Sequence, residues 1–237
     1  MPRPTRPSPR PRAIRLPPPE PAGLAHAHLA PLVSDGAVPS LAWAVVRDGD
    51  KAVGGFGGAG PETSFQIGSV TKVFTALVLA DMAERGEVHL SDPAARYLPG
   101  GVTAGPTLAD LATHTAGAGG LYSTAADLAR FLYACLLAVL AAPGTPAAPD
   151  TALEALGPAI RATLTSRRPI PGGQIGLAWH LARRGDHTIA WHNGMTGGFS
   201  AMIALDPARR LGVAAFANSA GSPPSPLDQA VLSAFGS

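Results

Sequence analysis

A serine and a lysine three positions apart stand out in the segment IGSVTKVFTALVLADMAERG, residues 67–86. The lysine, Lys72, is one of two in the chain; the other is Lys51, and every remaining basic position is arginine. Arginine keeps its charge at any accessible pH, whereas burial or a neighbouring cation can leave a lysine amine neutral. The spacing of Ser69 and Lys72 therefore suits a site that needs a neutral amine beside a hydroxyl group.

The same segment predicts the helix that would hold this pair. Apolar residues recur at helical spacing over residues 69–85, and Gly86 follows as a stop signal. Side chains three apart share a helix face, so the Lys72 amine can reach the Ser69 hydroxyl. The helix N-terminus adds free N–H groups and a positive dipole, which complete the requirements of an acyl-forming serine with a lysine base. The pattern alone fits equally well a capping serine followed by a solvated lysine.

Composition indicates a globular chain and limits its partners. The 237 residues are 46% hydrophobic and 14% charged, enough for one domain, or one domain with a lobe. Residues 1–22 carry five arginines and one glutamate, a net +4, so the remainder carries −2 of the total +2. The body lacks a basic stripe, and we expect no nucleic-acid partner. The single cysteine, Cys135, excludes an internal disulfide and is expected to be a small buried side chain.

The N-terminal 22 residues include nine prolines and no apolar stretch. They predict a disordered or polyproline-like tail and no secretory signal peptide. The longest apolar run, residues 131–142, is too short to span a bilayer. We expect a cytoplasmic protein from the sequence as written, and an extracytoplasmic one only if the start site is wrong. A nucleic-acid or membrane arm is the other interpretation of the tail.

The order of predicted elements favours an α+β fold. A short helix at 25–36 precedes a hairpin at 41–57 with an Asp-Gly turn, and helices, capped by Thr107 and Thr124 among others, fill the middle. A Pro-rich link is expected at 143–158. Four strands are predicted next, at 175–182, 187–193, 197–206 and 210–218. A helix at 225–235 is predicted to close the chain. Strands at both ends predict one antiparallel sheet with a helical middle.

The text around Ser69, TSFQIGSVTKVFTALVLADMAERGEVHLSDPAARYLP, resembles the serine β-lactamase and penicillin-binding-protein superfamily. It is most similar to the branch with class C β-lactamases, D-alanyl-D-alanine carboxypeptidases and related esterases. LADLATHTAG, GGLYSTAADLARFL and WHNGMTGGFSAMIALDPARRLGVAAFANS resemble later segments, in the family's order, over residues 37–237. The resemblance implies a β-lactamase/transpeptidase-like fold with a reduced helical lobe. It implies a single domain at 23–237, with its sheet at about 37–60 and 170–237 and its helical part at about 61–160.

The resemblance also implies roles for individual residues. Ser69 would be the nucleophile and Lys72 its proton acceptor, while residues 192–194 occupy the position of the family's Lys/His-Thr/Ser-Gly motif. The N–H groups of Ser69 and Met195 would form the oxyanion hole. His192 would hold a substrate carboxylate or tune the proton relay, although such a histidine standing alone is more often half-buried and structural. Asn193 and Gly194 would line the substrate, and a bulge or turn explains the glycine as well.

One motif of the family is absent. Its Tyr/Ser-x-Asn motif shuttles the proton to the leaving group, but this chain has only two asparagines, preceded two positions earlier by Trp191 and Phe216. Tyr122, in LYST, is the possible substitute. Two hypotheses follow: a smaller serine hydrolase acting on an amide, peptide, β-lactam or ester, or a truncated remnant that is a binding module or has no function. Ser-Lys pairs can work without a third group.

Cofactors and metals are not expected. The glycine-rich segment 54–60 does not open a helix after a strand, so it does not indicate a phosphate site. The histidine pair at 26 and 28 lies outside any plausible ligand set, and the histidines at 114, 187 and 192 lack acidic companions at metal spacing. We expect a monomer that acts on a small-molecule or peptidoglycan-like substrate.

Overall fold

A computed structural model describes residues 20–97, 106–113, 121–141, 151–220 and 224–236, with the side chains of 151–155 left undescribed. Most of the predicted tail, residues 1–19, lies outside these ranges. The tail's predicted end at residue 22 is too late, because helix α1 begins at Pro21. Proline suits the first turn of a helix, where its missing N–H would have no helical partner.

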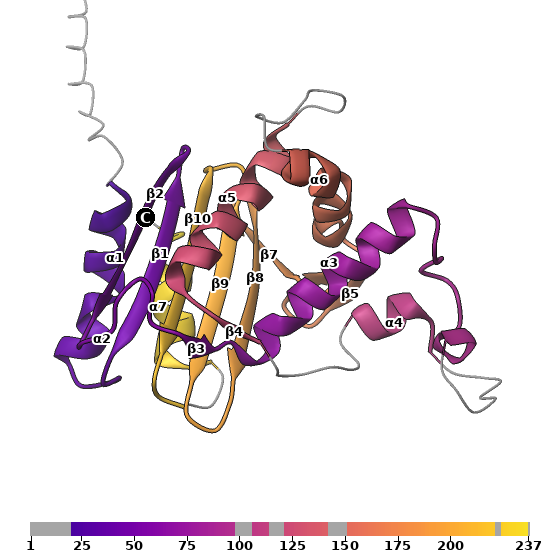
Figure 1. The fold of residues 1–237 in the computed structure, drawn as a ribbon. Helices are drawn as coiled ribbons and strands as arrows, with labels where there is room; N and C mark the ends of the chain where they lie inside the picture. Colours follow the sequence, from indigo (N-terminus) through magenta and orange to yellow (C-terminus); the bar gives the residue numbers. More distant parts are fainter. Residues whose placement is uncertain (1–19, 98–105, 114–120, 142–150, 221–223, 237) are drawn as a thin grey trace, which may run out of the picture.

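One antiparallel sheet of eight strands forms the centre of the molecule (Figure 1). Its order is β2-β1-β10-β9-β8-β7-β6-β5, so the N-terminal hairpin pairs with the last strand of the chain. This confirms the α+β prediction and the antiparallel sheet built from both ends. The strands are β1 (Leu41–Arg47), β2 (Asp50–Phe56), β5 (Arg168–Ile170), β6 (Gly173–Ile175), β7 (His180–Arg184), β8 (His187–Met195), β9 (Ser200–Asp206) and β10 (Leu211–Ala217).

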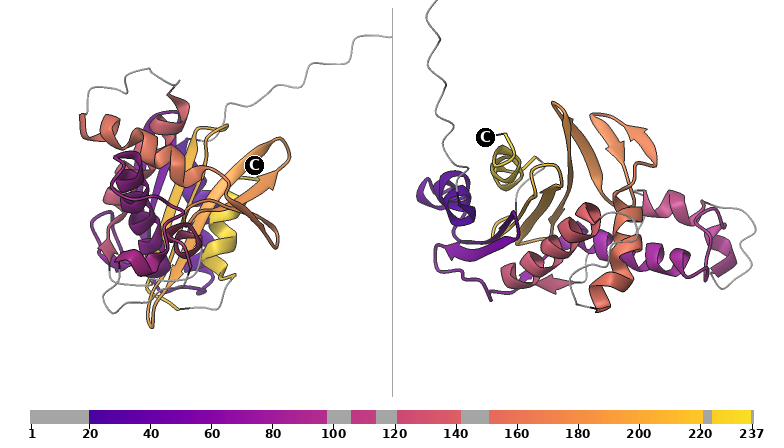
Figure 2. Two further views of the ribbon diagram at one scale, coloured as in Figure 1. Left: turned by 90° about the vertical axis from the view of Figure 1, so that its right-hand side faces the viewer. Right: turned by 90° about the horizontal axis from the view of Figure 1, so that it is seen from above.

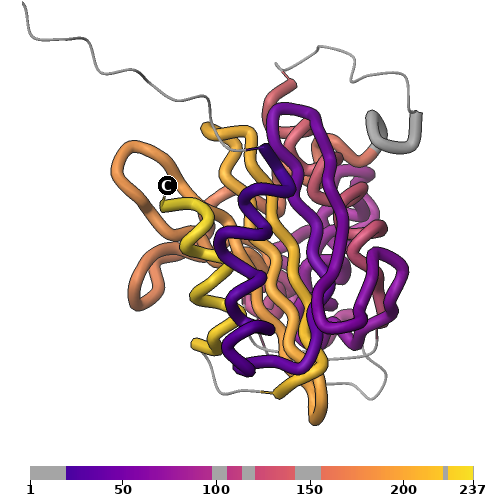
Figure 3. The backbone as a smooth tube through the Cα atoms, turned by 90° about the vertical axis from the view of Figure 1, so that its left-hand side faces the viewer, coloured from indigo at the N-terminus to yellow at the C-terminus, as the bar shows by residue number. Residues whose placement is uncertain are grey.

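Helices cover both faces of this sheet (Figure 2). On one face α1 and α7 lie side by side near the two ends of the chain, as Figure 3 shows, and α3, α5 and α6 pack on the other. The helices are α1 (Pro21–His28), α2 (Ala30–Ser34), α3 (Thr71–Glu84), α4 (Leu108–Ala112), α5 (Ala125–Leu140), α6 (Thr151–Leu164) and α7 (Pro226–Ser233). Among the described residues, none of these helices has the length and apolar character needed to cross a membrane.

The central strands are buried on both sides because each face meets its own helical layer. In β1, Ala42 and Ala44 pack in the core under α3 and α5, while Trp43 and Val45 pack under α1 and α7. Successive strand residues point to opposite faces, which produces this division. Cys135 of α5 is also buried, and burial raises the pKa of its thiol, as a small core side chain requires.

Several predicted elements have other bounds in the structure. The link expected at 143–158 is wrong from residue 151 onward, because α6 contains Pro158 and buries Ala159 and Ile160 in the core. The helix expected at 25–36 is two helices, α1 and α2. The strand expected at 175–182 is interrupted by Ala178, whose φ of 65° separates β6 from β7. Packing and a left-handed residue therefore overrode local propensity.

Candidate active site

Ser69 lies on a tight turn that leads directly into α3. A short strand, β3 (Phe65–Gln66), is followed by a 3-10 turn, η1 (Gly68–Val70), and then by the helix. Gly68 has a φ of 50°, and Ile67, Gly68 and Val70 are buried around the partly exposed Ser69. The helix predicted from residue 69 thus starts as a 3-10 turn, a common form for the first residues of a helix. This geometry places Ser69 just before the positive end of α3.

The Lys72 amine reaches the Ser69 hydroxyl. Lys72 Nζ donates to Ser69 Oγ over 2.8 Å, in a partly buried contact. Burial lowers the pKa of Lys72 below its ordinary value of 10.5, because a charged amine loses solvation there. The lowered pKa agrees with the sequence argument for a lysine that can be neutral. A solvated lysine on an open helix face would show neither feature.

Strand β8 touches the turn of Ser69 through two glycines. A Cβ built on Gly194 would lie 2.1 Å from the carbonyl oxygen of Ile67 and 2.8 Å from the backbone nitrogen of Ser69. A Cβ on Gly68 would lie 2.7 Å from the backbone nitrogen of Met195. Only glycine permits backbones to approach this closely. The glycine that sequence analysis assigned to a ligand approach is thus needed for the contact between β8 and η1.

The backbone N–H of Met195 points away from β9. Thr196 N donates to the Phe199 oxygen over 2.9 Å, and hydrogen-bonded and non-hydrogen-bonded pairs alternate along an antiparallel ladder. The preceding pair, Met195 with Ser200, is therefore a non-hydrogen-bonded pair. On the other side of β8, pairing with β7 ends at Trp191. The Met195 N–H accordingly lies on the edge of β8 that β7 leaves unpaired, where the turn at Gly68 approaches.

His192 lies on the same face of β8 as Gly194, two positions away. Its side chain is only 2% exposed, less than the half-buried histidine that its type suggests. Its Nδ1 lies 2.7 Å from the carbonyl oxygen of Asn193, and its ring contacts the His180 ring edge to face at 5.6 Å between centroids. His180 in turn stacks on Trp191 at 4.4 Å. These contacts hold the imidazole of His192 in place on β8, on the same face as Gly194.

Asn193 points to the opposite face. Its side-chain amide donates to Asp228 Oδ2 over 3.0 Å, on the side of the sheet covered by α7. Strand alternation explains this, because Asn193 lies between His192 and Gly194 in the strand and its side chain therefore points to the opposite face. The structure thus brings together Ser69, Lys72 and the backbone of residues 194–195, and holds the Asn193 side chain elsewhere.

Tyr122 lies beside the segment that leads to Ser69. It belongs to β4 (Tyr122–Ser123), which pairs with β3 so that Tyr122 faces Gln66. Its side chain is 62% exposed, and its hydroxyl accepts a hydrogen bond from Gln66 Nε2 at 2.5 Å. In the described contacts the hydroxyl meets Gln66 rather than Ser69 or Lys72. The pairing of β3 with β4 was not predicted, since two-residue strands carry no readable periodicity.

Two further observations complete the site. A cavity of about 300 Å³, open to solvent on one side, is lined by Lys72 and mainly by apolar side chains of α3 and α4. Sequence reasoning missed it, because its walls come from segments far apart in the chain. In the ranges that the structure covers, no three His, Cys, Asp or Glu side chains gather as a metal site. His114, considered in the sequence as a ligand candidate, lies outside those ranges.

An eight-stranded antiparallel sheet between helical layers, with a serine at the start of the helix beside its strand β8, is the architecture of β-lactamase-like α+β proteins. The family model described as beta-lactamase matches residues 25–118 and 117–235, and the chain belongs to the β-lactamase family.

Individual relatives agree with this assignment. A beta-lactamase of Escherichia coli (strain K12) is 37% identical in an alignment of 106 residues that covers 40% of this chain and 28% of that protein. The match therefore spans less than a third of that relative's length. A class C beta lactamase from Rhodobacter sphaeroides has a TM-score of 0.74 at 16% identity, covering 90% of this chain and 99% of that one. The D-alanine carboxypeptidase AmpC from Burkholderia cenocepacia has a TM-score of 0.70 at 22% identity, covering 90% and 97%. Both structures show the shared fold.

Proposed function

We propose that this chain is a serine hydrolase that forms an acyl-enzyme on Ser69, with Lys72 as the base. The 2.8 Å contact between Lys72 Nζ and Ser69 Oγ carries the proposal, and the lowered pKa of Lys72 supports it. A neutral amine at hydrogen-bond distance can take the hydroxyl proton as the oxygen attacks. Membership of the β-lactamase family supports the same chemistry.

The reaction has two halves. Ser69 Oγ attacks the carbonyl carbon of an ester, amide or β-lactam, and its proton passes to Lys72 Nζ. The bond from this carbon to the leaving group breaks, and Lys72 returns the proton to the departing oxygen or nitrogen. Water then attacks the acyl-enzyme, which releases a carboxylic acid and restores the serine. The N–H groups of Ser69 and Met195 stabilise the oxyanion in both halves.

The remaining predicted residues have secondary roles in this proposal. His192 orients the substrate carboxylate or tunes the relay from its buried position next to Gly194. Asn193 and Gly194 contribute through the backbone, since the Asn193 side chain is bound to Asp228. Tyr122 is the candidate substitute for the absent Tyr/Ser-x-Asn motif. We propose a small molecule or a peptidoglycan-like peptide as the substrate, which the likeness to a D-alanine carboxypeptidase supports, and a monomer as the acting form.

The absence of the Tyr/Ser-x-Asn motif favours a second candidate, a remnant that binds ligands without turnover. Covalent labelling separates the two. The purified protein is incubated with a fluorescent penicillin and, separately, with a fluorescent fluorophosphonate, and adducts are located by mass spectrometry. We expect label on Ser69, none in Ser69→Ala, and wild-type labelling in the control Ser64→Ala, whose exposed serine precedes β3. Lack of any adduct with both reagents would favour the remnant.

A further inference from the structure

The cavity beside Lys72 runs along one face of α3. Lys72, Thr75 and Leu79 line it at helical spacing, so it extends over two turns of the helix. At a rise of about 1.5 Å per residue, the stretch of helix from Lys72 to Leu79 is about 10 Å long. Because Lys72 Nζ contacts Ser69 Oγ, one end of this cavity adjoins the proposed nucleophile.

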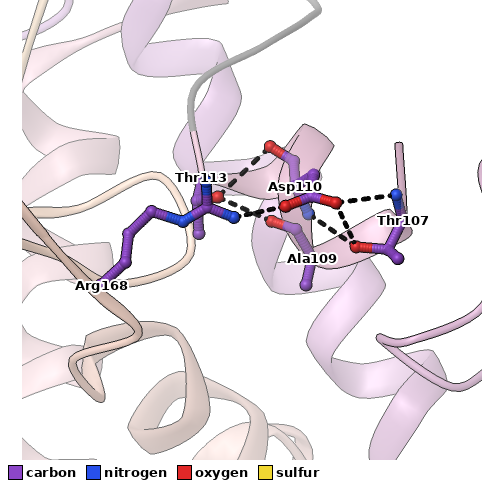
Figure 4. Close-up of polar contacts among 5 residues, drawn as sticks. All are labelled: Thr107, Ala109, Asp110, Thr113 and Arg168. Carbon is purple, nitrogen blue, oxygen red and sulfur yellow. Dashed lines mark hydrogen bonds and ion pairs between the residues drawn. The ribbon is translucent and has the colours of Figure 1, made fainter. Parts of the chain in front are cut away.

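The opposite wall is the short helix α4, and Figure 4 shows its N-terminal cap and its contact with Arg168. Thr107 and Asp110 form a reciprocal capping box, and Arg168 Nη2 donates to Asp110 Oδ1 at 2.5 Å. The hydrogen bonds from Thr107 and from Arg168 lower the pKa of Asp110 to about 2. Ala178, which also lines the cavity, donates its N–H to the Ala112 oxygen over 2.8 Å. The wall is thus a fixed part of the fold.

The lining is mainly apolar, and its charged group is Lys72, at the end next to Ser69. Leu79, Leu108 and Leu111 project into it together with small alanines of α3, α4 and the β6–β7 connection. The one hydroxyl among the lining residues, that of Thr75, donates to the Thr71 oxygen over 3.3 Å. Such a lining offers burial to hydrocarbon and no partner to a peptide or a charged group.

We propose that this cavity binds the aliphatic acyl chain of an ester substrate, so that the enzyme prefers medium-chain carboxylic esters. The inference rests on the proposed hydrolase function and specifies its substrate class. With the chain in the cavity, the ester carbonyl lies at Ser69 Oγ. Ser69 takes up the acyl group, the alcohol leaves with the proton held by Lys72, and water releases the fatty acid. The volume of about 300 Å³ is at the lower end for ligand pockets, which suits one unbranched chain rather than a whole peptide.

Chain-length dependence tests this proposal directly. Initial rates are measured with p-nitrophenyl acetate, butyrate, hexanoate and octanoate, and kcat/KM is compared along the series. Each buried methylene is expected to raise kcat/KM about fourfold until the cavity is full. Thr75→Trp should flatten the series by filling the cavity, whereas the control Val78→Trp, at a 60% exposed position of the same helix outside the lining, should keep it.

A binding measurement separates failure of this inference from failure of the hydrolase. Calorimetric titration with octanoate and acetate should show octanoate binding to wild type and to Ser69→Ala, and weaker binding to Thr75→Trp. If Ser69 is labelled, but kcat/KM does not change with chain length and octanoate does not bind, the acyl-chain cavity alone is overturned. Octanoate binding without any acylation would overturn the hydrolase while keeping an alkyl site. Loss of both would overturn both.

Discussion

At the scale of single residues, the site depends on how closely β8 approaches the turn of Ser69. We expect Gly194→Ala to displace this turn, because the added Cβ would overlap the Ile67 oxygen at 2.1 Å. Overpacking of this kind costs about 1–3 kcal/mol of stability. Acylation should fall at least about tenfold, since a small displacement of reacting groups is expensive in rate. Urea unfolding and the rate of labelling by a fluorescent penicillin measure the two effects.

The control is Gly197→Ala, two residues beyond β8, where a Cβ would meet nothing within 4 Å. It should match wild type in both measurements. If Gly194→Ala labels Ser69 at the wild-type rate, the contact between β8 and η1 does not position the nucleophile.

Lys72 gives the proposed chemistry a pH signature. A protonated amine cannot accept the Ser69 proton, so the acylation rate should rise with pH through the pKa of Lys72. Burial lowers that pKa, so the rise should be centred below 10.5. Lys72→Arg keeps a positive charge but loses the acceptor, and we expect acylation to be slower by about 10² or more, without this rise. Stopped-flow labelling from pH 6 to 10 measures the acylation rate of both proteins. Equal rates in wild type and Lys72→Arg would mean that Lys72 is not the base.

At the scale of elements, strand β8 is hydrogen-bonded to the C-terminal helix α7. Asp228, only 4% exposed, accepts from the backbone of Ser225 at 2.9 Å in the capping box of α7, and from Asn193 of β8 at 3.0 Å. One carboxylate thus satisfies a helix end and holds the strand that carries residues 194–195. We expect Asp228→Ala to cost about 1–3 kcal/mol, because it leaves buried donors without a partner.

The matched control for this prediction is Asp127→Ala. Asp127 occupies the corresponding position of α5, where its backbone N–H donates to Thr124 Oγ1, but its side chain is 56% exposed. It should cost less than Asp228→Ala in urea unfolding and leave labelling of Ser69 unchanged. A larger loss in Asp127→Ala would mean that the link from α7 to β8 adds no stability.

At the scale of the whole molecule, the sequence predicted the features that depend on neighbouring residues. The Asp-Gly turn predicted the hairpin of β1 and β2, and Thr107 and Thr124 cap α4 and α5 as expected. The Ser-x-x-Lys spacing predicted the contact of Ser69 with Lys72. The sequence could not show the cavity or the bond from Asn193 to Asp228, because these join residues distant along the chain. It misplaced α6, since prolines before and within this helix outweighed its apolar face.

The pairing of both chain ends in one sheet has a consequence for unfolding. Strand β1 contributes Trp43 to the core under α1 and α7, and its neighbouring residues to the core under α3 and α5, which also holds Trp179. Both helical layers pack on the same sheet, so unfolding of the sheet would expose both cores, and we expect one cooperative transition. Two variants report the two cores separately: one keeps only Trp43 and the other keeps only Trp179, with phenylalanine at the remaining tryptophan positions. In each, tryptophan fluorescence and far-ultraviolet circular dichroism should give the same urea midpoint; different midpoints would mean that the helical layers unfold independently.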